Sequence, residues 1–197
     1  MKLLPSAVRT KIRKLLGGQD VQWCRVVMNQ RTAEYVNTLN VREMDALEVS
    51  GEHWAKFPFR SYRQASLPEF DICARPLENE KWDIIFVEQV LEHVLFPRAA
   101  TKNLWQMLRP NGILVVTTPF LIRLHDFPVD CSRWTELGMR HLLMEAGFNS
   151  DNIETGAWGN RICLIANLKT WPWYLPPIHS LKNEPLYPLV VWAFARK

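Results

Sequence analysis

A short polar segment, residues 124–134, holds the side chains best suited to acid–base chemistry. It reads Leu-His-Asp-Phe-Pro-Val-Asp-Cys-Ser-Arg-Trp and places one histidine, two acids and one arginine in a loop that need not form a core. An imidazole with an ordinary pKa near ~6.5 can take a proton from a hydroxyl at neutral pH, so His125 is a candidate general base. Asp130 or Asp126 can orient that imidazole. Asp130 and Arg133 can equally pair with each other and fix the loop. We predict His125, Asp130 and Arg133 as the catalytic group.

Two acidic positions follow apolar runs elsewhere in the chain. Glu48-Val49-Ser50-Gly51 closes a run that begins at Asp45, and Glu88-Gln89 comes directly after Asp83-Ile84-Ile85-Phe86-Val87. If both runs are parallel strands of an α/β sheet, these residues lie outside the carboxyl ends of the strands, where such sheets bind ligands. A ligand site is therefore predicted at this edge.

Residues 82–119 predict the strand, helix and strand that would position those acids. The run 83–87 has no polar alternation, as expected of a strand that is covered on both faces. Apolar residues then recur at helical spacing, with Pro97 in a first turn, where proline is tolerated. Residues 109–112, Arg-Pro-Asn-Gly, end the helix, and a second apolar run covers 113–118. Two parallel strands joined by a helix cross over right-handedly.

This stretch resembles the later half of the class I, or seven-strand, S-adenosylmethionine-dependent methyltransferase domain, of the type-11-like kind. Members have an aspartate in an apolar strand, an acid after it, a Leu-Glu-His-Val segment, a helix that ends in Leu-Arg/Lys-Pro-Gly-Gly and a strand that ends in proline. The matching residues here are Trp82-Asp83-Ile84, Glu88, Leu91-Glu92-His93-Val94, Leu108-Arg109-Pro110-Asn111-Gly112 and Thr118-Pro119. They occur in the same order as in the family.

The resemblance implies a fold. We expect a three-layer, Rossmann-like α/β sandwich with a mostly parallel sheet of seven strands, the last of them antiparallel. The first strand is expected at 45–49, the second at 59–65, a brief third at 70–73 and the seventh at 189–195. The crossovers between the first and fourth strands must be short, because few residues separate Glu48 from Asp83.

The resemblance also implies S-adenosylmethionine as the cofactor. In the family, glycines after the first strand let the backbone approach the cofactor, and an acid anchors its charged end. That loop is degenerate here, because Ser50 and Glu52 stand where glycines are usual. The predicted cofactor-binding residues are Glu48, Val49, Ser50, Gly51, Ser66, Asp71, Ile72, Cys73, Glu88 and Gln89. Asp71 can instead cap a turn, and both possibilities stay open.

The polar loop resembles a His-x-x-Pro-x-Asp-x-x-Arg-hydrophobic-Thr segment of some class I methyltransferases. The matching residues are His125, Pro128, Asp130, Arg133, Trp134 and Thr135. Thr135 would then begin a helix over 135–146 that Gly147 ends. His93, by contrast, is expected a full turn into the helix that follows Glu88-Gln89, so a packed histidine is favoured there over a base.

The favoured function is transfer of a methyl group from S-adenosylmethionine to a hydroxyl of a small or glycan-like substrate. Displacement on a sulfonium needs mainly positioning, and a hydroxyl acceptor needs a base. No cysteine or histidine pair has metal-ligand spacing, so a metal-free enzyme is the simplest version. A catalytically inactive cofactor-binding regulator or partner subunit is the alternative. A nicotinamide dehydrogenase is disfavoured, because residues 48–51 lack the G-x-G-x-x-G pattern.

Composition fits a single methyltransferase-like domain over residues 1–197. The 197 residues are 48% hydrophobic and 22% charged, with a net charge of +4. Five bases and no acid fall in the first eighteen residues, which leaves the remainder slightly negative, so nucleic acid is not expected as a partner. The cysteines are expected to be reduced thiols because they lie far apart. They are Cys24, Cys73, Cys131 and Cys163.

The two ends of the chain are expected to cover the sheet. Residues 1–40 should form a helical cap with helices over 4–16 and 26–39, the second of which could turn Arg31 and Tyr35 towards the cleft. Residues 156–188 should form an irregular aromatic insertion that covers the acceptor side.

No apolar run reaches the ~20 residues of a membrane span, and the basic N-terminus lacks a secretory pattern, so a cytoplasmic protein is expected. Contact of the first helix with an anionic surface and a homodimer both stay open.

Overall fold

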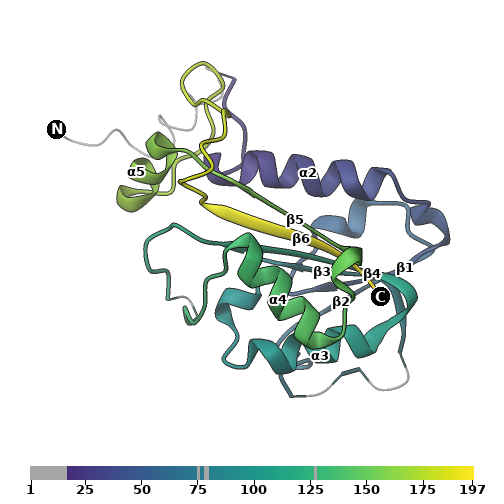
Figure 1. The fold of residues 1–197 in the computed structure, drawn as a ribbon. Helices are drawn as coiled ribbons and strands as arrows, with labels where there is room; N and C mark the ends of the chain where they lie inside the picture. Colours follow the sequence, from purple (N-terminus) through teal and green to yellow (C-terminus); the bar gives the residue numbers. More distant parts are fainter. Residues whose placement is uncertain (1–16, 75, 78–79, 127) are drawn as a thin grey trace.

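The computed structural model describes residues 17–74, 76–77, 80–126 and 128–197. Its centre is a six-stranded sheet with the order β2-β1-β3-β4-β6-β5 (Figure 1). The strands are β1 (Asp45–Val49), β2 (Ser61–Ala65), β3 (Trp82–Glu88), β4 (Leu108–Pro119), β5 (Ile153–Trp158) and β6 (Val190–Arg196). The first four pair in parallel, and β6 lies antiparallel between β4 and β5. The expected mostly parallel α/β class, with its last strand antiparallel, is confirmed.

The strand, helix and strand predicted for residues 82–119 are present. Alternate side chains of β3 enter the cores on opposite faces of the sheet, with Ile84 and Phe86 on one side and Ile85 and Val87 on the other. α3 (Pro97–Met107) has proline in its first turn and leads into β4. Residues 109–112 are the irregular start of β4 and not a turn that precedes it: Asn111 has a φ of 63° there, and the pairing of β3 with β4 shifts register.

The helices cover both faces of the sheet (Figure 1). α2 (Val26–Asn37) packs on one face, and α3 and α4 (Glu136–Ala146) pack on the other. The hydroxyl of Thr135 accepts a hydrogen bond from the Gly138 backbone at 3.1 Å, which starts α4 where the sequence predicts. Gly147 ends it with a φ of 120°.

Two elements differ from the sequence-based expectations. Residues 70–73 form turns and no strand, which leaves six strands in the described part of the chain and not seven. A carboxylate oxygen of Asp71 accepts a hydrogen bond from the Cys73 backbone at 2.8 Å, so this short segment turns back on itself. Within residues 156–188, the unassigned apolar element is a helix, α5 (Arg161–Lys169), capped by the side chain of Asn160.

Five short 3₁₀ turns complete the structure. They are η1 (Trp23–Arg25), η2 (Val41–Glu43), η3 (His53–Lys56), η4 (Leu91–His93) and η5 (Ser150–Asn152). η3 is the short crossover between β1 and β2. Because η4 is a single turn and α3 begins only at Pro97, the expectation that His93 lies a full turn into a helix is wrong. His93 is the last residue of η4, at the carboxyl edge of the sheet.

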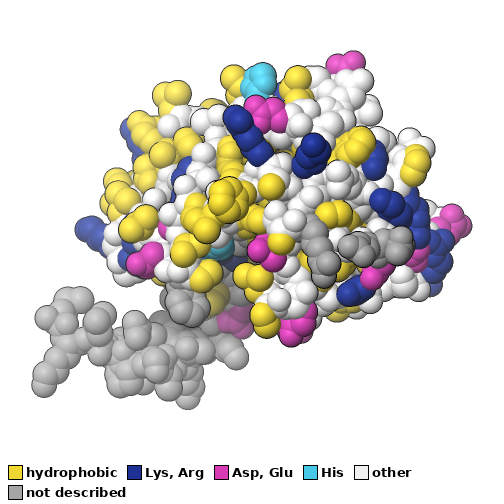
Figure 2. Space-filling model, turned by 90° about the horizontal axis from the view of Figure 1, so that it is seen from below, with side chains coloured by type: hydrophobic (Ala, Val, Ile, Leu, Met, Phe, Trp, Pro, Cys, Tyr) yellow, Lys and Arg dark blue, Asp and Glu magenta, His cyan; other side chains and the backbone are white. Residues whose placement is uncertain are grey.

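The surface below the sheet in Figure 1 is mixed in character. Figure 2 shows acidic and basic side chains interspersed with hydrophobic ones on this face. The helix expected over residues 4–16 lies outside the described residues. None of the described helices combines the length and the apolar character needed to span a bilayer.

Candidate functional site

A cavity of about 190 Å³ opens at the carboxyl ends of β1 and β3. Four of the ten predicted cofactor residues line it, namely Glu48, Gly51, Glu88 and Gln89. Its remaining wall comes from Arg25, Met28, Asn29, Glu52 and His53. The start of α2 therefore closes the side of the cavity that faces the two strand ends. Arg31 and Tyr35, further along α2, point elsewhere: Arg31 pairs with Glu34 on the surface, and Tyr35 stacks on Phe194.

Glu48 organises the loop after β1. Its side chain is 3% exposed, and its carboxylate accepts hydrogen bonds from the backbone N–H groups of His53 and Trp54, each at 2.9 Å. The Tyr62 hydroxyl donates a third at 2.8 Å. A Cβ on Gly51 would overlap the Oε1 atom of Glu48, so glycine is required there. The chain thus keeps the family's acid and one close-approach glycine, although it lacks the other glycines.

Glu88, at the end of β3, has a side chain whose protonated and charged forms are both populated near neutral pH. The Trp54 indole N–H donates to its Oε2 atom at 2.9 Å. Burial raises the pKa of Glu88 to about 7, and the nearby Glu48 carboxylate adds to the rise. The indole bond and the Arg25 guanidinium act in the opposite direction. A cation bound in this cavity would shift Glu88 towards its charged form.

The other six predicted cofactor residues lie around this cavity in different ways. Val49 is buried in the core, and Ser50 has a φ of 59°, where glycine is usual. Ser66 directly follows β2, as predicted. Asp71 lines a separate cavity of about 280 Å³, and its neighbours Ile72 and Cys73 form the turn that Asp71 caps. A cofactor that reached all ten would have to run along the edge of the sheet from β3 to β2.

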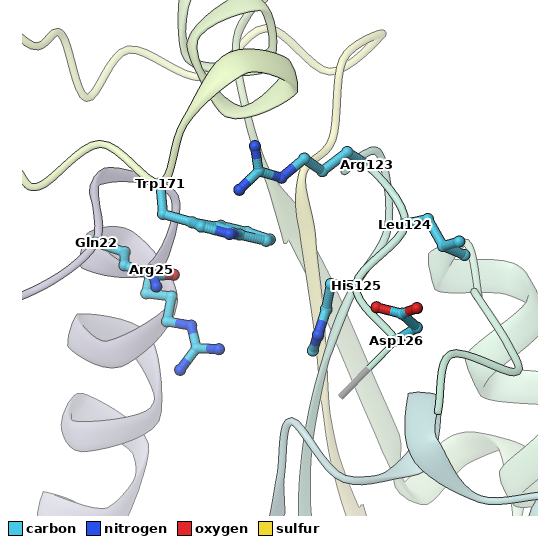
Figure 3. Close-up of a pocket in the computed structure, with 7 residues that line it drawn as sticks. All are labelled: Gln22, Arg25, Arg123, Leu124, His125, Asp126 and Trp171. Carbon is cyan, nitrogen blue, oxygen red and sulfur yellow. The ribbon is translucent and has the colours of Figure 1, made fainter. Parts of the chain in front are cut away.

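A second and larger cavity, of about 490 Å³, adjoins the first through Arg25, which lines both. Figure 3 shows Arg25 on the α2 side, His125 on the side of the sheet and Trp171 projecting between them. The Trp171 ring stands edge-on to His125, with centroids 5.8 Å apart, and the Arg123 guanidinium lies 4.9 Å from the Trp171 centroid. Trp171 belongs to the aromatic segment 156–188 and lines this larger cavity.

Burial lowers the pKa of His125 below its ordinary value, and the neighbouring His93 ring acts in the same direction. Asp130 opposes this shift, and Arg133 and Arg25 add to it. His125 is therefore a neutral imidazole at neutral pH, able to accept a proton or to act as a ligand.

Asp130 and Arg133 fix the loop that carries His125. Arg133 donates to both oxygens of Asp130, and Asp130 also accepts the backbone N–H of His125 at 2.8 Å. Burial opposes ionisation of Asp130, but the bonds from Arg133 and His125 hold its pKa below the usual range. Asp130 therefore holds the backbone of His125, and no hydrogen bond joins it to the imidazole in the described part of the chain. These contacts support a positioning role for the pair.

A cluster of three side chains at this edge was not anticipated. Glu92, His93 and His125 come together from η4 and from the loop after β4, and the rings of the two histidines stand 4.7 Å apart. The signal in the sequence was the adjacent pair Glu92-His93. The sequence predicts a helix at this pair, and a helix does not bring it close to His125.

The sheet order and the antiparallel β6 are typical of a methyltransferase-type α/β fold, and the acids at the ends of β1 and β3 lie in a cavity at its carboxyl edge. A family model described as "Methyltransferase domain" matches residues 27–116, which span β1 to β4. This match, together with the fold, supports a class I S-adenosylmethionine-dependent methyltransferase domain, with S-adenosylmethionine as the methyl donor.

Solved structures agree on the fold. The chain matches a possible histamine N-methyltransferase from Thermotoga maritima with a TM-score of 0.57 and 11% identity, covering 97% of this chain and 96% of the other. It matches a putative sarcosine dimethylglycine methyltransferase from Galdieria sulphuraria with a TM-score of 0.57 and 11% identity, covering 98% of both chains.

A third match is phosphoethanolamine N-methyltransferase 2 from Haemonchus contortus in complex with S-adenosyl-L-methionine. Its TM-score is 0.53 at 11% identity, and the match covers 86% of this chain and 52% of that one. Among the curated proteins, none matches this sequence.

Proposed function

We propose that this methyltransferase methylates a hydroxyl group of a small or glycan-like substrate. The observation that carries the proposal is the neutral His125 imidazole on the wall of the larger cavity. Arg25 lines both this larger cavity and the smaller one, where we predict the cofactor. An acceptor in the larger cavity would face a methyl group presented from the smaller one. Positioning of two reactants in this way accounts for much of the rate in a transfer that needs little other assistance.

The smaller cavity suits the charges of S-adenosylmethionine. The cofactor carries a sulfonium and an ammonium group, and the cavity offers the carboxylates of Glu48 and Glu88. Oε1 of Glu48 accepts one hydrogen bond, from His53, so it can take a second donor. Glu88 would ionise as the cationic cofactor binds. We propose that Gly51 and Gln89 contact the same part of the cofactor through the loops that follow β1 and β3.

The larger cavity suits an acceptor with a ring and an anionic group. The Trp171 ring offers a face on which a sugar or another ring can stack. Arg25 and Arg123 provide two guanidinium groups that can bind a phosphate or carboxylate on the acceptor. In the simplest, metal-free form of the reaction, His125 takes the hydroxyl proton as the oxygen attacks the methyl group. Asp130 and Arg133 keep the His125 backbone in place.

The alternative is a regulator that binds the cofactor without catalysis. The loop after β1 favours it, because Ser50 and Glu52 replace glycines that approach the cofactor in the family. Ser50 nevertheless takes the positive φ that a glycine would supply, so the path of the backbone is kept, as cofactor binding requires in either function. One observation favours catalysis instead. A large cavity with a titratable imidazole has no evident use in a protein that only binds the cofactor.

Calorimetry of the purified protein with S-adenosylmethionine and S-adenosylhomocysteine tests cofactor binding. We expect saturable binding of both ligands at micromolar to millimolar concentration. No heat at millimolar ligand, from protein with a folded spectrum, would contradict both the enzyme and the regulator.

A screen of acceptors then separates the enzyme from the regulator. Nucleotide sugars, glycan fragments and phosphorylated alcohols are incubated with S-adenosylmethionine, and release of S-adenosylhomocysteine is followed. Turnover with hydroxylated acceptors, lost in the matching deoxy compounds, is expected. Turnover only with amines would contradict hydroxyl methylation, and binding without turnover across the panel would favour the regulator.

A further inference from the structure

Two imidazoles and one carboxylate meet where the larger cavity reaches the sheet. Glu92 and His93 come from η4, directly after β3, and His125 comes from the loop after β4. One ligand atom from each lies within 4.8 Å of the other two. A single ion between them would be within reach of all three after small side-chain rotations.

Glu92 is the most unusual member. It is 0% exposed, and neither of its carboxylate oxygens has a hydrogen-bond partner in the described part of the chain. A buried carboxylate without hydrogen bonds is costly, and native proteins satisfy nearly all such groups. Its backbone carbonyl is well bonded, since it accepts from Cys131 at 2.7 Å, so the segment itself is firmly placed. The side chain is held in the interior with its oxygens free for something that is not part of the chain.

His93 is oriented as a metal-binding histidine would be. Its Nδ1 atom bonds to the Val129 carbonyl, which fixes the proton on Nδ1 and leaves the lone pair on Nε2. Nε2 lies 3.7 Å from Oε1 of Glu92. That separation is too long for a hydrogen bond, and it suits two ligand atoms that bind one ion lying off the line between them at a roughly tetrahedral angle. Ligand histidines in proteins almost always donate their other nitrogen to a carbonyl or carboxylate in this way.

His125 is the third member of the cluster, and it is the member that lines the larger cavity. Its ring has no hydrogen bond in the described part of the chain, and it lines the larger cavity. Arg133, the nearest cation on the same loop, is already neutralised by Asp130. Arg25 is the other cation that acts on both Glu92 and His125, and it faces them from the start of α2. One position of an ion held here would face the cavity.

We propose that Glu92, His93 and His125 bind one divalent transition-metal ion, with Zn²⁺ as the best fit. Two imidazole nitrogens and one carboxylate are the ligands of many catalytic zinc sites, which keep a further position open for water or substrate. Mg²⁺ and Ca²⁺ prefer oxygen ligands, so the two histidines disfavour them. The site is of the open kind, because the described residues supply three ligands and the larger cavity adjoins His125.

Such an ion changes one step of the proposed function, and this consequence rests on that function. A hydroxyl bound to the ion loses its proton at a lower pH than a free hydroxyl. The ion would then activate the acceptor oxygen, the hydroxyl proton would pass to water in the open cavity, and His125 would hold the ion and not take the proton itself. The expectation of a metal-free reaction would be replaced.

Metal binding can be measured without cofactor or acceptor. Untagged protein is stripped with a chelator, dialysed and titrated with Zn²⁺ by calorimetry, with metal content measured after gel filtration. We expect one equivalent per chain. Co²⁺ serves as a second probe, and we expect visible absorption bands typical of a nitrogen and oxygen site with few ligands.

The variants decide where the ion binds. Glu92→Gln and His93→Asn preserve size, and the asparagine amide can still donate to the Val129 carbonyl. Each of these, and His125→Ala, is expected to weaken Zn²⁺ binding at least ~10²-fold, since even outer partners of metal ligands cost ~10–100-fold. His141→Ala is the matched control, because His141 is exposed on α4. Its affinity should equal that of the unaltered protein.

Two results would overturn the proposal. One is the absence of stoichiometric binding to folded protein, and the other is binding that Glu92→Gln and His93→Asn leave unchanged. In either case the simpler account holds, in which Glu92 and His93 form an ion pair. Titration of the same samples with S-adenosylhomocysteine keeps the outcomes separate. Protein that binds S-adenosylhomocysteine but no Zn²⁺ contradicts only the metal site. Protein that binds Zn²⁺ but no S-adenosylhomocysteine contradicts only the proposed function.

Discussion

Ser50 adopts a backbone conformation that residues with side chains rarely take. Its φ of 59° lies in the left-handed region, its side chain is exposed, and its backbone N–H donates to the Ala65 carbonyl at 3.0 Å. This bond between the loop after β1 and the end of β2 holds the residue in the strained region. Glycine reaches the same φ without steric cost.

Ser50→Gly is therefore expected to stabilise the protein. The free energy of unfolding should rise by about 0.5–1 kcal/mol, as the relief of a strained left-handed residue outweighs the added freedom of glycine in the unfolded chain. Urea unfolding followed by circular dichroism measures this. Ser66→Gly is the control, because Ser66 is not among the described residues with positive φ, and it should lower stability. Equal changes in the free energy of unfolding in Ser50→Gly and Ser66→Gly would contradict the idea that Ser50 is strained.

The raised pKa of Glu88 makes a prediction about pH. The folded protein keeps the Glu88 proton up to about pH 7, whereas the unfolded chain releases it near ~4.3. The folded state binds more protons in this window, so the contribution of Glu88 to stability is complete at low pH and is lost as the pH rises through 7.

Glu88→Gln cannot ionise, so it should remove that loss. Between pH 5 and 8 the variant should show a flatter dependence of unfolding free energy on pH, and at pH 8 it should be more stable by roughly 1–3 kcal/mol. Chemical unfolding at a series of pH values measures this. Glu69→Gln, at an exposed position, should follow the unaltered protein. If the free energy of unfolding of Glu88→Gln fell more steeply with pH than that of the unaltered protein, the folded state would favour the charged form of Glu88.

His125 is predicted to matter for turnover and not for cofactor binding. His125→Ala should lower kcat by roughly 10²–10⁴-fold, whether the imidazole accepts the proton or holds an ion that activates the hydroxyl. The affinity for S-adenosylhomocysteine should change by less than about twofold, because His125 lines the other cavity. Parallel loss of cofactor binding and thermal stability would instead assign His125 to loop packing. His141→Ala again provides the control.

The loop after β1 and η3 together replace the glycine-rich turn and helix usual at this place. Glu48 accepts the backbone N–H groups that begin η3, and Trp54 packs its ring on Phe86 with centroids 4.4 Å apart. The same Trp54 donates to Glu88 at the end of β3. One short element thus links both acids of the smaller cavity.

Gly51→Ala tests that arrangement. The added methyl group would displace the Glu48 carboxylate from the His53 and Trp54 N–H groups, so the affinity for S-adenosylhomocysteine should fall at least about tenfold, or ~1.4 kcal/mol. Gly138→Ala is the control, since its new Cβ would have only ordinary contacts, 3.4 Å or more away. Calorimetry compares the two. Unchanged affinity in Gly51→Ala would place the cofactor away from this loop.

The sequence predicts the strands that are buried along their whole length and the helix whose two ends carry clear signals. β3 and β4 are recognisable because they are buried on both faces, and α4 because Thr135 and Gly147 mark its ends. Residues 70–73 mislead, because four residues are too few to distinguish a strand from a turn that Asp71 closes through its own side chain. α5 has no readable stripe, since Ile162 and Leu168 are exposed while Asn167 is buried.

The candidate site is harder to predict, for a physical reason. Its acids lie at strand ends, and their position follows from the alternation of strand and helix. The cluster of Glu92, His93 and His125 depends instead on how one 3₁₀ turn and one irregular loop meet. Neither has a period in the sequence, so only the folded chain brings these residues together.

At the scale of the whole molecule, the single sheet separates two cores. One contains α3 and α4, and the other contains α2 and α5. Both include alternate residues of the same strands, so neither core can be lost while the other keeps its sheet intact. Residues 17–197 are therefore expected to unfold as one unit.

Thermal unfolding should show this cooperativity. Tryptophan fluorescence and far-ultraviolet circular dichroism should give coincident transitions, because tryptophans lie in both cores and report on each. Trp54→Phe and Trp105→Phe, one from each core, should lower the midpoint by different amounts without separating the two signals. Transitions that separate would divide the chain into two folding units.

The place of β6 in the sheet has a consequence for how the protein is made. β5 pairs only with β6 among the described strands, and β6 is later in the chain (Figure 1). While the ribosome is still adding residues 159–189, β1 to β4 already have all their mutual partners, but β5 has none. Arrival of β6 lets β5 join the sheet and draws the intervening segment, with Trp171, across the cleft. A nascent chain of this protein would form its larger cavity in the same late step that closes its sheet.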